Sequence, residues 1–317
     1  MSGPRSVRQE IGDSLTVSGY RVGSMLSKFV PGALSSVVGT TVGIPAAIGM
    51  RDKRRLVHRH MRRVRPDATP LEIRLLGQQV FDSYARYYLE SFKLPALSAR
   101  QVAAGFTVEG FDEHIQPALD AGTGAVLALP HLGGWEWAGR WATDRGHAMS
   151  VVVEPLSPPE LFEWFARLRR QFKMTVIPLG PDAGAQCLRA IRDNQILCLL
   201  SDRFIGGGGV AVDFFGETTI LPAGPATLAI RTGAPLLPTA VYFTDRGVGH
   251  HGVVRPPIPV PVGGRLRQQV GTMTGLLAGE LESLIRRAPE QWHLLQPNWP
   301  SDPGFEHLET LGKLLHE

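Results

Sequence analysis

Residues 123–140, TGAVLALPHLGGWEWAGR, decide the fold that we expect for this chain. The run from Thr123 to Pro130 is apolar, which is the pattern of a buried strand. The run stops at the proline, and a pair of glycines soon afterwards predicts a turn. The residues WEWAGRWATDR then predict a helix that carries three tryptophans. His131 is therefore expected at the carboxyl end of a strand, where open α/β sheets place their sites.

Glu136 lies five residues after His131. On one helix, residues five apart would be about 140° apart and on different faces. We therefore expect His131 in the turn and Glu136 in the first helical turn, with the carboxylate folded back on the imidazole. A carboxylate on one ring nitrogen fixes the tautomer and makes the other nitrogen a better base. The pair predicts a general base for a hydroxyl proton; in the alternative, His131 is a capping or satisfied core residue.

Other charged residues follow predicted strands in the same way. Glu154 comes directly after a strand from Met149 to Val153, and Asp202 and Arg203 follow an apolar strand that begins at Gln195. A helix between these strands ends with several basic residues, of which Arg169 and Arg170 are two. Basic residues are common in a last helical turn because of the helix dipole alone. These side chains are thus candidates for a site, with ordinary salt bridges as the alternative.

Strands alternate with helices between residues 106 and 245, so we expect an α/β fold. This fold would have one central, mostly parallel sheet with helices on both faces. Two capping boxes, at residues 69–72 and 157–160, mark the starts of helices, and the first of these should run to about Leu94. We divide the chain into an N-terminal segment (residues 1–65), an α/β domain (66–300) and a tail (301–317).

The N-terminal segment combines an apolar stretch with a basic one. Residues 29–50 carry no charge but include two prolines, and eight Lys or Arg follow within the next fifteen residues. Residues 1–65 hold twelve basic and three acidic residues, a net charge of +9, whereas the remainder holds 21 and 26, a net charge of −5. This pattern predicts a helical segment that binds an anionic membrane surface peripherally. The alternative is a helix pair packed on the body with solvated arginines.

Several classes of function are disfavoured by what the sequence lacks. The basic run belongs to no recognised nucleic-acid module and has no interleaved aromatics, so we expect no nucleic acid partner. The glycines at 206–209 lack the Lys-Ser/Thr of a phosphate-binding loop. The chain has no metal-ligand motif and no G-x-S-x-G elbow, so we expect neither a metal nor a serine nucleophile. Cys187 and Cys198 are predicted to be reduced core residues.

Five blocks together carry a resemblance to a known family. They are HLGGWE (131–136), which has the form H-x4-E, then DR (202–203), FFG (214–216), TGAPLLP (232–238) and APEQW (288–292). In this order they resemble the glycerolipid acyltransferase superfamily, and specifically the lipid A (lauroyl-type) branch. Within that branch the chain is similar to the phosphatidylinositol mannoside acyltransferases of actinobacteria over about residues 25–300. Typical members carry a clearer N-terminal transmembrane helix than residues 29–50 offer.

The resemblance implies a reaction and a location. A palmitoyl group would move from palmitoyl-CoA, as co-substrate and without a cofactor, to the 6-hydroxyl of a mannose in a phosphatidylinositol mannoside. The enzyme would sit peripherally on the cytoplasmic face of the cell membrane, bound to the anionic lipids of the inner leaflet. The alternatives are another lipid acceptor (a lysophospholipid or glycerol phosphate), a hydrolase, and a non-catalytic membrane-binding protein.

The resemblance also implies roles for the candidate residues. His131 would be the base and Glu136 its orienting carboxylate. Arg169, or its neighbour Arg170, would contact an anionic group on the donor or the acceptor. From its place at the end of a strand, Glu154 is expected to bind an acceptor hydroxyl or to pair with one of the arginines of the following helix. Asp202 and Arg203 would position the acceptor or the thioester.

Overall fold

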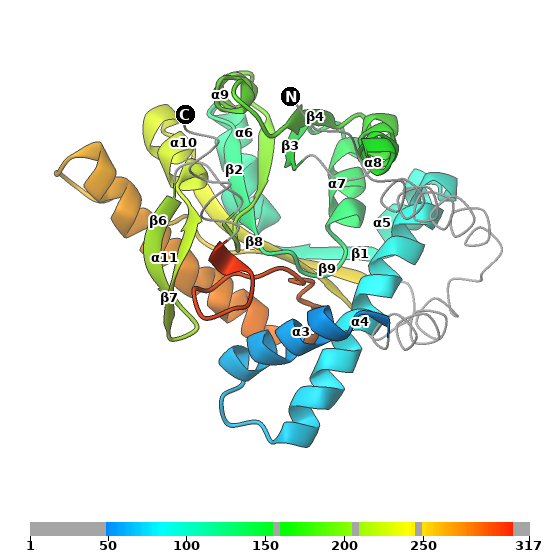
Figure 1. Ribbon diagram of the computed structural model, residues 1–317. Helices are drawn as coiled ribbons and strands as arrows, with labels where there is room; N and C mark the ends of the chain where they lie inside the picture. Colours follow the sequence, from blue (N-terminus) through cyan, green and yellow to red (C-terminus); the bar gives the residue numbers. More distant parts are fainter. Residues whose placement is uncertain (1–48, 155–158, 205–208, 245–248, 307–317) are drawn as a thin grey trace, which may run out of the picture.

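The computed structural model describes residues 49–154, 159–204, 209–244 and 249–306 (Figure 1). Its centre is a seven-stranded sheet in the order β1-β9-β8-β2-β5-β3-β4. Strands β2, β3, β4, β5 and β8 are parallel, β9 is antiparallel to β8, and β1 is parallel to β9. The predicted α/β fold with one mostly parallel sheet is therefore confirmed. The strands are β1 (Phe106–Glu109), β2 (Ala125–Leu129), β3 (Met149–Val153), β4 (Thr175–Pro178), β5 (Ile196–Leu200), β8 (Leu236–Phe243) and β9 (His250–Val254).

Strand β2 shows how the sheet divides two hydrophobic layers. All five of its residues are buried, as expected for a central parallel strand. Because successive side chains point to opposite faces, Val126 and Ala128 join one core cluster, and Leu127 and Leu129 join the other. The first layer contains α9 (Ala183–Arg192), α10 (Gly224–Thr232) and α11 (Leu266–Arg287); the second contains α5 (Ala99–Ala104), α6 (Gln116–Asp120), α7 (Trp135–Asp144) and α8 (Pro159–Gln171).

Two further helices and a hairpin pack beside the sheet and its layers (Figure 1), and short helical segments lie at Leu94–Ala96, Phe111–Ile115 and Pro289–Gln291. Helix α3 (Arg51–Val64) packs beside α4 (Pro70–Lys93), and α4 contacts the short turn at Pro289–Gln291. The predicted capping box opens α4: Thr69 N–H donates to Glu72 Oε2 at 2.7 Å, and Glu72 N–H donates to Thr69 Oγ1 at 3.3 Å. Strands β6 (Gly209–Phe214) and β7 (Glu217–Pro222) form an antiparallel hairpin packed against α11.

Some predictions concern residues outside the described ranges. These are most of the apolar stretch at 29–50, the start of the capping box at 157, most of the glycine run at 206–209, and most of the C-terminal tail. Among the helices that the structure does describe, none combines the length and the apolar character needed to cross a bilayer. The membrane-associated segment and the division into 1–65, 66–300 and 301–317 stay predictions.

Candidate active site

The turn after β2 holds His131 at the carboxyl end of the sheet. His131 has the same parity as Leu127 and Leu129, so its side chain continues on the α7 side of the sheet. Gly133 adopts φ +63°, and a Cβ there would approach Val241 O to 1.8 Å. Only glycine permits both this conformation and this approach. The sequence therefore places a tight turn here, and the turn leads directly into α7.

Asp202 is the carboxylate that orients His131. Its Oδ1 is 2.6 Å from His131 Nδ1, and its Oδ2 accepts the backbone N–H of His131 at 2.9 Å. Trp292 Nε1 donates to the same Oδ2 at 2.7 Å. Burial would raise the pKa of Asp202, but His131 and these donors hold it below its ordinary value. An ionised Asp202 accepts a hydrogen bond from a protonated Nδ1, so in that tautomer Nε2 is the ring nitrogen that can accept a proton.

The predicted contact between Glu136 and His131 is wrong. Glu136 is buried, and its Oε1 accepts from Tyr87 Oη at 3.1 Å and from Arg169 Nη2 at 2.5 Å. The first turn of α7 therefore turns the carboxylate toward α4 and α8 instead of back onto the imidazole. A buried carboxylate needs a cationic partner and hydrogen bonds, and Arg169 with Tyr87 supply them. The negative charge of Glu136 is therefore balanced by Arg169, and Glu136 lies beside His131 without contacting its ring.

Arg169 and Arg170 differ sharply in position. The Arg169 side chain is 12% exposed and faces the site, whereas Arg170 is 56% exposed and lies 3.6 Å from Glu163. Burial alone would lower the pKa of Arg169, but Glu136 and Tyr87 raise it, so the guanidinium stays charged. Of the two arginines, Arg169 is the one that the structure brings to the site.

Arg203 and Glu154 form a second ion pair beside the first. Arg203 Nη2 bonds Glu154 Oε2, and the Glu154 side chain remains 41% exposed. The predicted pairing of Glu154 with an arginine of α8 is therefore wrong, because its partner is Arg203. Asp202 and Arg203 do not pair with each other, because Asp202 turns to His131. Both members of the Arg203–Glu154 pair line the cavity described next.

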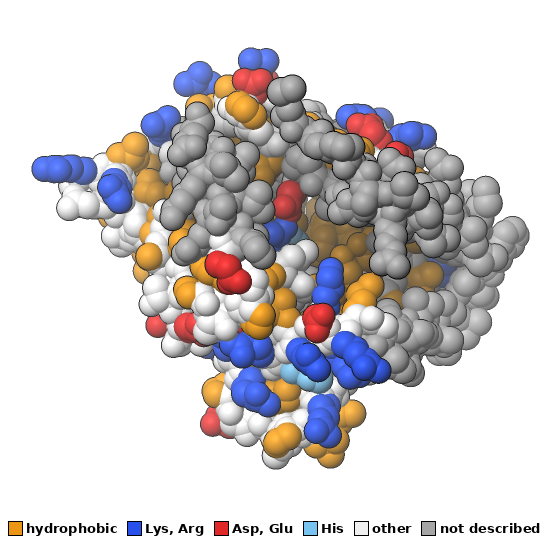
Figure 2. All heavy atoms as spheres, viewed as in Figure 1, with side chains coloured by type: hydrophobic (Ala, Val, Ile, Leu, Met, Phe, Trp, Pro, Cys, Tyr) orange, Lys and Arg blue, Asp and Glu red, His pale blue; other side chains and the backbone are white. Residues whose placement is uncertain are grey.

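A hydrophobic cavity of about 250 Å³ opens at His131. Apolar side chains from β1, β2, β3, β5, β8 and β9 line it, and α4, α7 and α8 close it. Figure 2 shows a hollow with hydrophobic side chains on this face of the molecule. At its deep end lies Ile196, which pairs with Ala125, six residues before His131. At about 3.3 Å per residue, the cavity extends roughly 20 Å from the imidazole.

Five of the six predicted site residues line this cavity, namely His131, Glu136, Glu154, Arg169 and Arg203. The sixth, Asp202, is fully buried behind His131. The structure thus brings all six candidates together, although it pairs them differently from the prediction.

Sequence reasoning missed three residues at the site. Trp292 and His293 come from the C-terminal segment, where His293 N–H donates to His131 O at 2.7 Å. Tyr87 comes from the aromatic stripe of α4. The APEQW block ends at Trp292, so its resemblance to the family was the one signal that this segment approaches the site.

The half-buried cysteine beside the site, Cys198, is not an activated nucleophile. Cys198 lines the cavity, and burial raises the pKa of its thiol to about 12. Only a small fraction of the thiol is therefore ionised at neutral pH. In the described ranges, no group of three or more His, Cys, Asp or Glu side chains is arranged to hold a metal ion. The site therefore consists of an imidazole that is bonded to a buried carboxylate and lines an apolar cavity.

Comparisons with known proteins agree with this geometry. A family model described as bacterial lipid A biosynthesis acyltransferase matches residues 9–301. A phosphatidylinositol mannoside acyltransferase of Mycolicibacterium smegmatis is 36% identical over 313 residues, which are 97% of this chain and 99% of that protein. One from Mycobacterium tuberculosis is 40% identical over 226 residues, 70% of this chain and 69% of that protein. The resemblance in the sequence blocks is confirmed: the chain belongs to the bacterial lipid A biosynthesis acyltransferase family, and it is an acyltransferase.

Proposed function

We propose that the protein transfers a palmitoyl group from palmitoyl-CoA to the 6-hydroxyl of a mannose in a phosphatidylinositol mannoside. The observation that carries this proposal is the orientation of His131 by Asp202 at the mouth of the cavity. A roughly 20 Å apolar cavity suits a long acyl chain, and the imidazole lies where the thioester carbonyl would then be. The names of the relatives support the choice of acceptor.

In the proposed mechanism, His131 Nε2 takes the proton of the mannose hydroxyl. The oxygen attacks the thioester carbonyl carbon, and the tetrahedral intermediate collapses with cleavage of the C–S bond. The thiolate of CoA then takes the proton from the imidazolium, which restores the neutral base. Asp202 stabilises the imidazolium that forms in between. General base catalysis contributes typically 10²–10⁴-fold, so positioning by the cavity and the flanking ion pairs must supply much of the remainder.

The two ion pairs that line the cavity suit the acceptor side of this reaction. Arg203–Glu154 is partly exposed, and Glu154 retains oxygen atoms that can accept from sugar hydroxyls. Arg169, although paired with Glu136, adds positive potential near an anionic lipid headgroup. We propose these residues for acceptor binding and retain Asp202 for orienting the base.

We also propose that the protein works at the inner leaflet as a peripheral enzyme. Helix α3 exposes several basic residues, and the start of α4 exposes Leu71 and Leu75. Each basic residue near an anionic bilayer contributes about 1 kcal/mol to the free energy of membrane binding. Exposed apolar side chains strengthen this binding by inserting into the lipid interface. Such a location would place the site next to both lipid substrates.

The test is transfer of labelled palmitate from palmitoyl-CoA to purified phosphatidylinositol mannosides, with lysophospholipid and glycerol phosphate as competing acceptors. Wild-type protein should acylate the mannoside, and His131→Ala should lose at least about 10²-fold in kcat. Transfer only to another acceptor would overturn the proposed substrate. Free fatty acid without any acylated product would indicate a hydrolase.

Two further variants in the same assay distinguish the role of the Asp202 carboxylate from that of the Glu136 carboxylate. Asp202→Asn should lose about 10²-fold in kcat, because an amide does not stabilise the imidazolium. Glu136→Gln should act mainly on stability or on KM, since it leaves the buried Arg169 without its counter-charge. A kcat loss in Glu136→Gln as large as in His131→Ala, with Asp202→Asn unaffected, would restore Glu136 as the orienting residue.

A further inference from the structure

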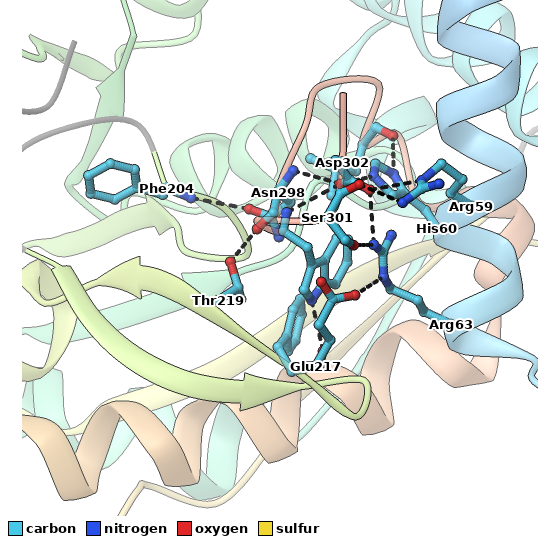
Figure 3. A network of polar contacts seen from close by, with 12 residues as sticks. Arg59, His60, Arg63, Phe204, Glu217, Thr219, Asn298, Ser301 and Asp302 are labelled. Atoms are coloured by element: carbon cyan, nitrogen blue, oxygen red, sulfur yellow. Dashed lines mark hydrogen bonds and ion pairs between the residues drawn. The ribbon is translucent and has the colours of Figure 1, made fainter. Parts of the chain in front are cut away.

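A buried histidine ties the basic helix α3 to the C-terminal segment (Figure 3). The His60 side chain is fully buried, with Nδ1 at 3.1 Å from Leu294 O and Nε2 at 3.1 Å from Asp302 Oδ2. Its ring packs against Trp292 and Trp299, with centroids 5.9 and 5.1 Å away. The ring is thus buried in contact with two indoles, and these packing contacts together with its polar neighbours define its position closely.

The Asp302 carboxylate contacts donors from helix α3 and from the turn at residues 298–299. Its side chain is buried, and Oδ2 accepts the backbone N–H groups of Asn298 at 3.0 Å and Trp299 at 3.2 Å. Arg63 Nη2 lies 3.0 Å from Oδ1. Burial would raise the pKa of Asp302, but His60, the Asn298 N–H and Arg63 lower it, so the carboxylate is ionised. Asp302 therefore joins α3 to the turn that presents Asn298.

Asn298 then clamps the main chain on either side of Arg203. Its Nδ2 donates to the backbone oxygen of Asp202 at 3.0 Å, and its Oδ1 accepts the Phe204 N–H at 3.4 Å. The Asn298 side chain is fully buried, and Thr219 Oγ1 donates to its backbone oxygen. The segment that follows β5 is not part of a strand, so these contacts help to fix the main chain at Asp202, whose carboxylate is also bonded to His131 and Trp292.

We propose that His60, Asp302 and Asn298 form a positioning relay that holds Asp202 in place for His131. The proposal rests on the function proposed above, in which Asp202 orients the base. None of the three touches the reacting atoms: each acts through the next, and the last acts through the main chain of Asp202. A misplacement of about 1 Å in a catalytic constellation can cost about 10²-fold in rate. The relay also makes α3 part of the frame that carries the catalytic carboxylate.

A double-mutant cycle with Asp202 tests the last step. Asn298→Ala should lower kcat about 10- to 100-fold with KM for both substrates changed less than about threefold. In an Asp202→Ala background there is no carboxylate left to position, so adding Asn298→Ala should change kcat less than about twofold. If Asn298→Ala lowers kcat by the same factor in the wild-type and the Asp202→Ala backgrounds, the relay is overturned. A general structural defect caused by Asn298→Ala would lower kcat in both backgrounds alike.

Asn194 offers a matched control. It makes the same kind of clamp at the other end of the sheet, where it accepts Gly124 N–H at 2.9 Å and donates to Leu119 O at 2.8 Å. It has φ +57°, so Asn194→Ala also strains the backbone. Asn194→Ala should lose stability in urea unfolding while kcat stays within about twofold of wild type. A kcat loss equal to that of Asn298→Ala would mean that kcat simply follows stability, which would contradict the relay.

Two substitutions of His60 test the first step, even if Asn298→Ala fails to fold. The amide nitrogen of Gln reaches the place of Nε2, next to Asp302, and that of Asn reaches the place of Nδ1, next to Leu294 O. Each therefore keeps one of the two contacts. The relay runs through Asp302, so His60→Gln should keep kcat within about threefold while His60→Asn loses about tenfold. Equal kcat in the two variants would overturn this step.

Wild type and His131→Ala are assayed alongside these variants. If wild type transfers no acyl group, the proposed function fails before the relay is tested. If wild type transfers, His131→Ala does not, and Asn298→Ala keeps full kcat, the function stands and the relay fails.

Discussion

At the scale of the residue, the active site contains a second imidazole that must stay neutral. His293 is buried, and burial together with the proximity of His131 lowers its pKa to about 3. Its Nε2 is 2.9 Å from Ser83 Oγ. Because His293 is uncharged at neutral pH, it does not oppose the imidazolium that the proposed mechanism forms on His131.

This pKa predicts how stability depends on pH. The ordinary pKa of histidine is about 6.5, so between pH 6.5 and 3 the unfolded chain binds a proton that folded His293 does not. The free energy of unfolding should therefore fall as the pH is lowered, by up to about 1.4 kcal/mol per pH unit from this residue. In His293→Gln that contribution is absent.

Urea unfolding of both proteins at pH 7.5, 6 and 5 would check this. The advantage of wild type over His293→Gln should be largest at pH 7.5 and shrink toward pH 5. A difference that stays constant across the three pH values would show that His293 titrates alike in the folded and unfolded chains.

The residue scale also shows where sequence reasoning succeeds and where it stops. The apolar run and the Gly-Gly turn place His131 correctly, but its partner comes from 71 residues further along the chain. Strands β2 and β5 are parallel neighbours, with Leu129 opposite Leu200. His131 and Asp202 each lie two residues beyond this pair and therefore meet. The contact between His131 and Asp202 thus follows from the register of β2 and β5. The spacing of residues along the chain carries no information about this register, and it pointed to Glu136 instead.

At the scale of the element, α7 sets the depth of the cavity. It runs back from the turn at His131, so Trp135 lies near the mouth and the later residues lie deeper. Ala138 and Ala142 both line the cavity. At 1.5 Å per residue, Ala142 lies about 10 Å further along the helix than Trp135, whereas Ala138 lies only about 5 Å along it.

Ala142→Leu should therefore shorten the acyl chain that the protein accepts. The added carbons would occupy the deep part of the cavity, so kcat/KM should fall about tenfold or more for palmitoyl-CoA but little for octanoyl-CoA. Ala138→Leu is the matched control near the mouth, and it should lower kcat/KM for both donors alike. Identical donor ratios in wild type, Ala138→Leu and Ala142→Leu would show that the chain does not enter this cavity.

Elements were predictable wherever their signals are local. The capping box at Thr69 and the apolar run of β2 correctly gave the start of α4 and the central strand. Local signals could not predict that β9 runs antiparallel to β8. The direction of a strand depends on its connection to the preceding strand and on which edge of the sheet is free. The same holds for the hairpin of β6 and β7, whose partners are set by packing on α11.

At the scale of the whole molecule, charge and apolar surface meet on the helical pair α3–α4. Helix α3 exposes Arg51, Lys53, Arg55 and Arg62, while its other face is buried on the body. Leu71 and Leu75, at the start of α4, are 64% and 56% exposed. Figure 2 shows basic and hydrophobic side chains together at the foot of the molecule. A surface of this composition suits the headgroup region of an anionic bilayer.

Replacing Arg51, Lys53, Arg55 and Arg62 of α3 by Gln should weaken binding to vesicles that contain anionic phospholipid. Each contributes about 1 kcal/mol near such a surface, so the apparent Kd should rise at least about tenfold, and added salt should weaken wild-type binding in the same direction. The matched control replaces four exposed arginines elsewhere on the body, which lowers the net charge equally: Arg145, Arg192, Arg231 and Arg267. If both variants lose the same affinity in a sedimentation assay, net charge and not helix α3 directs binding. If only the α3 variant loses affinity while its transfer to detergent-solubilised acceptor is unchanged, these four side chains serve membrane binding and not the chemistry.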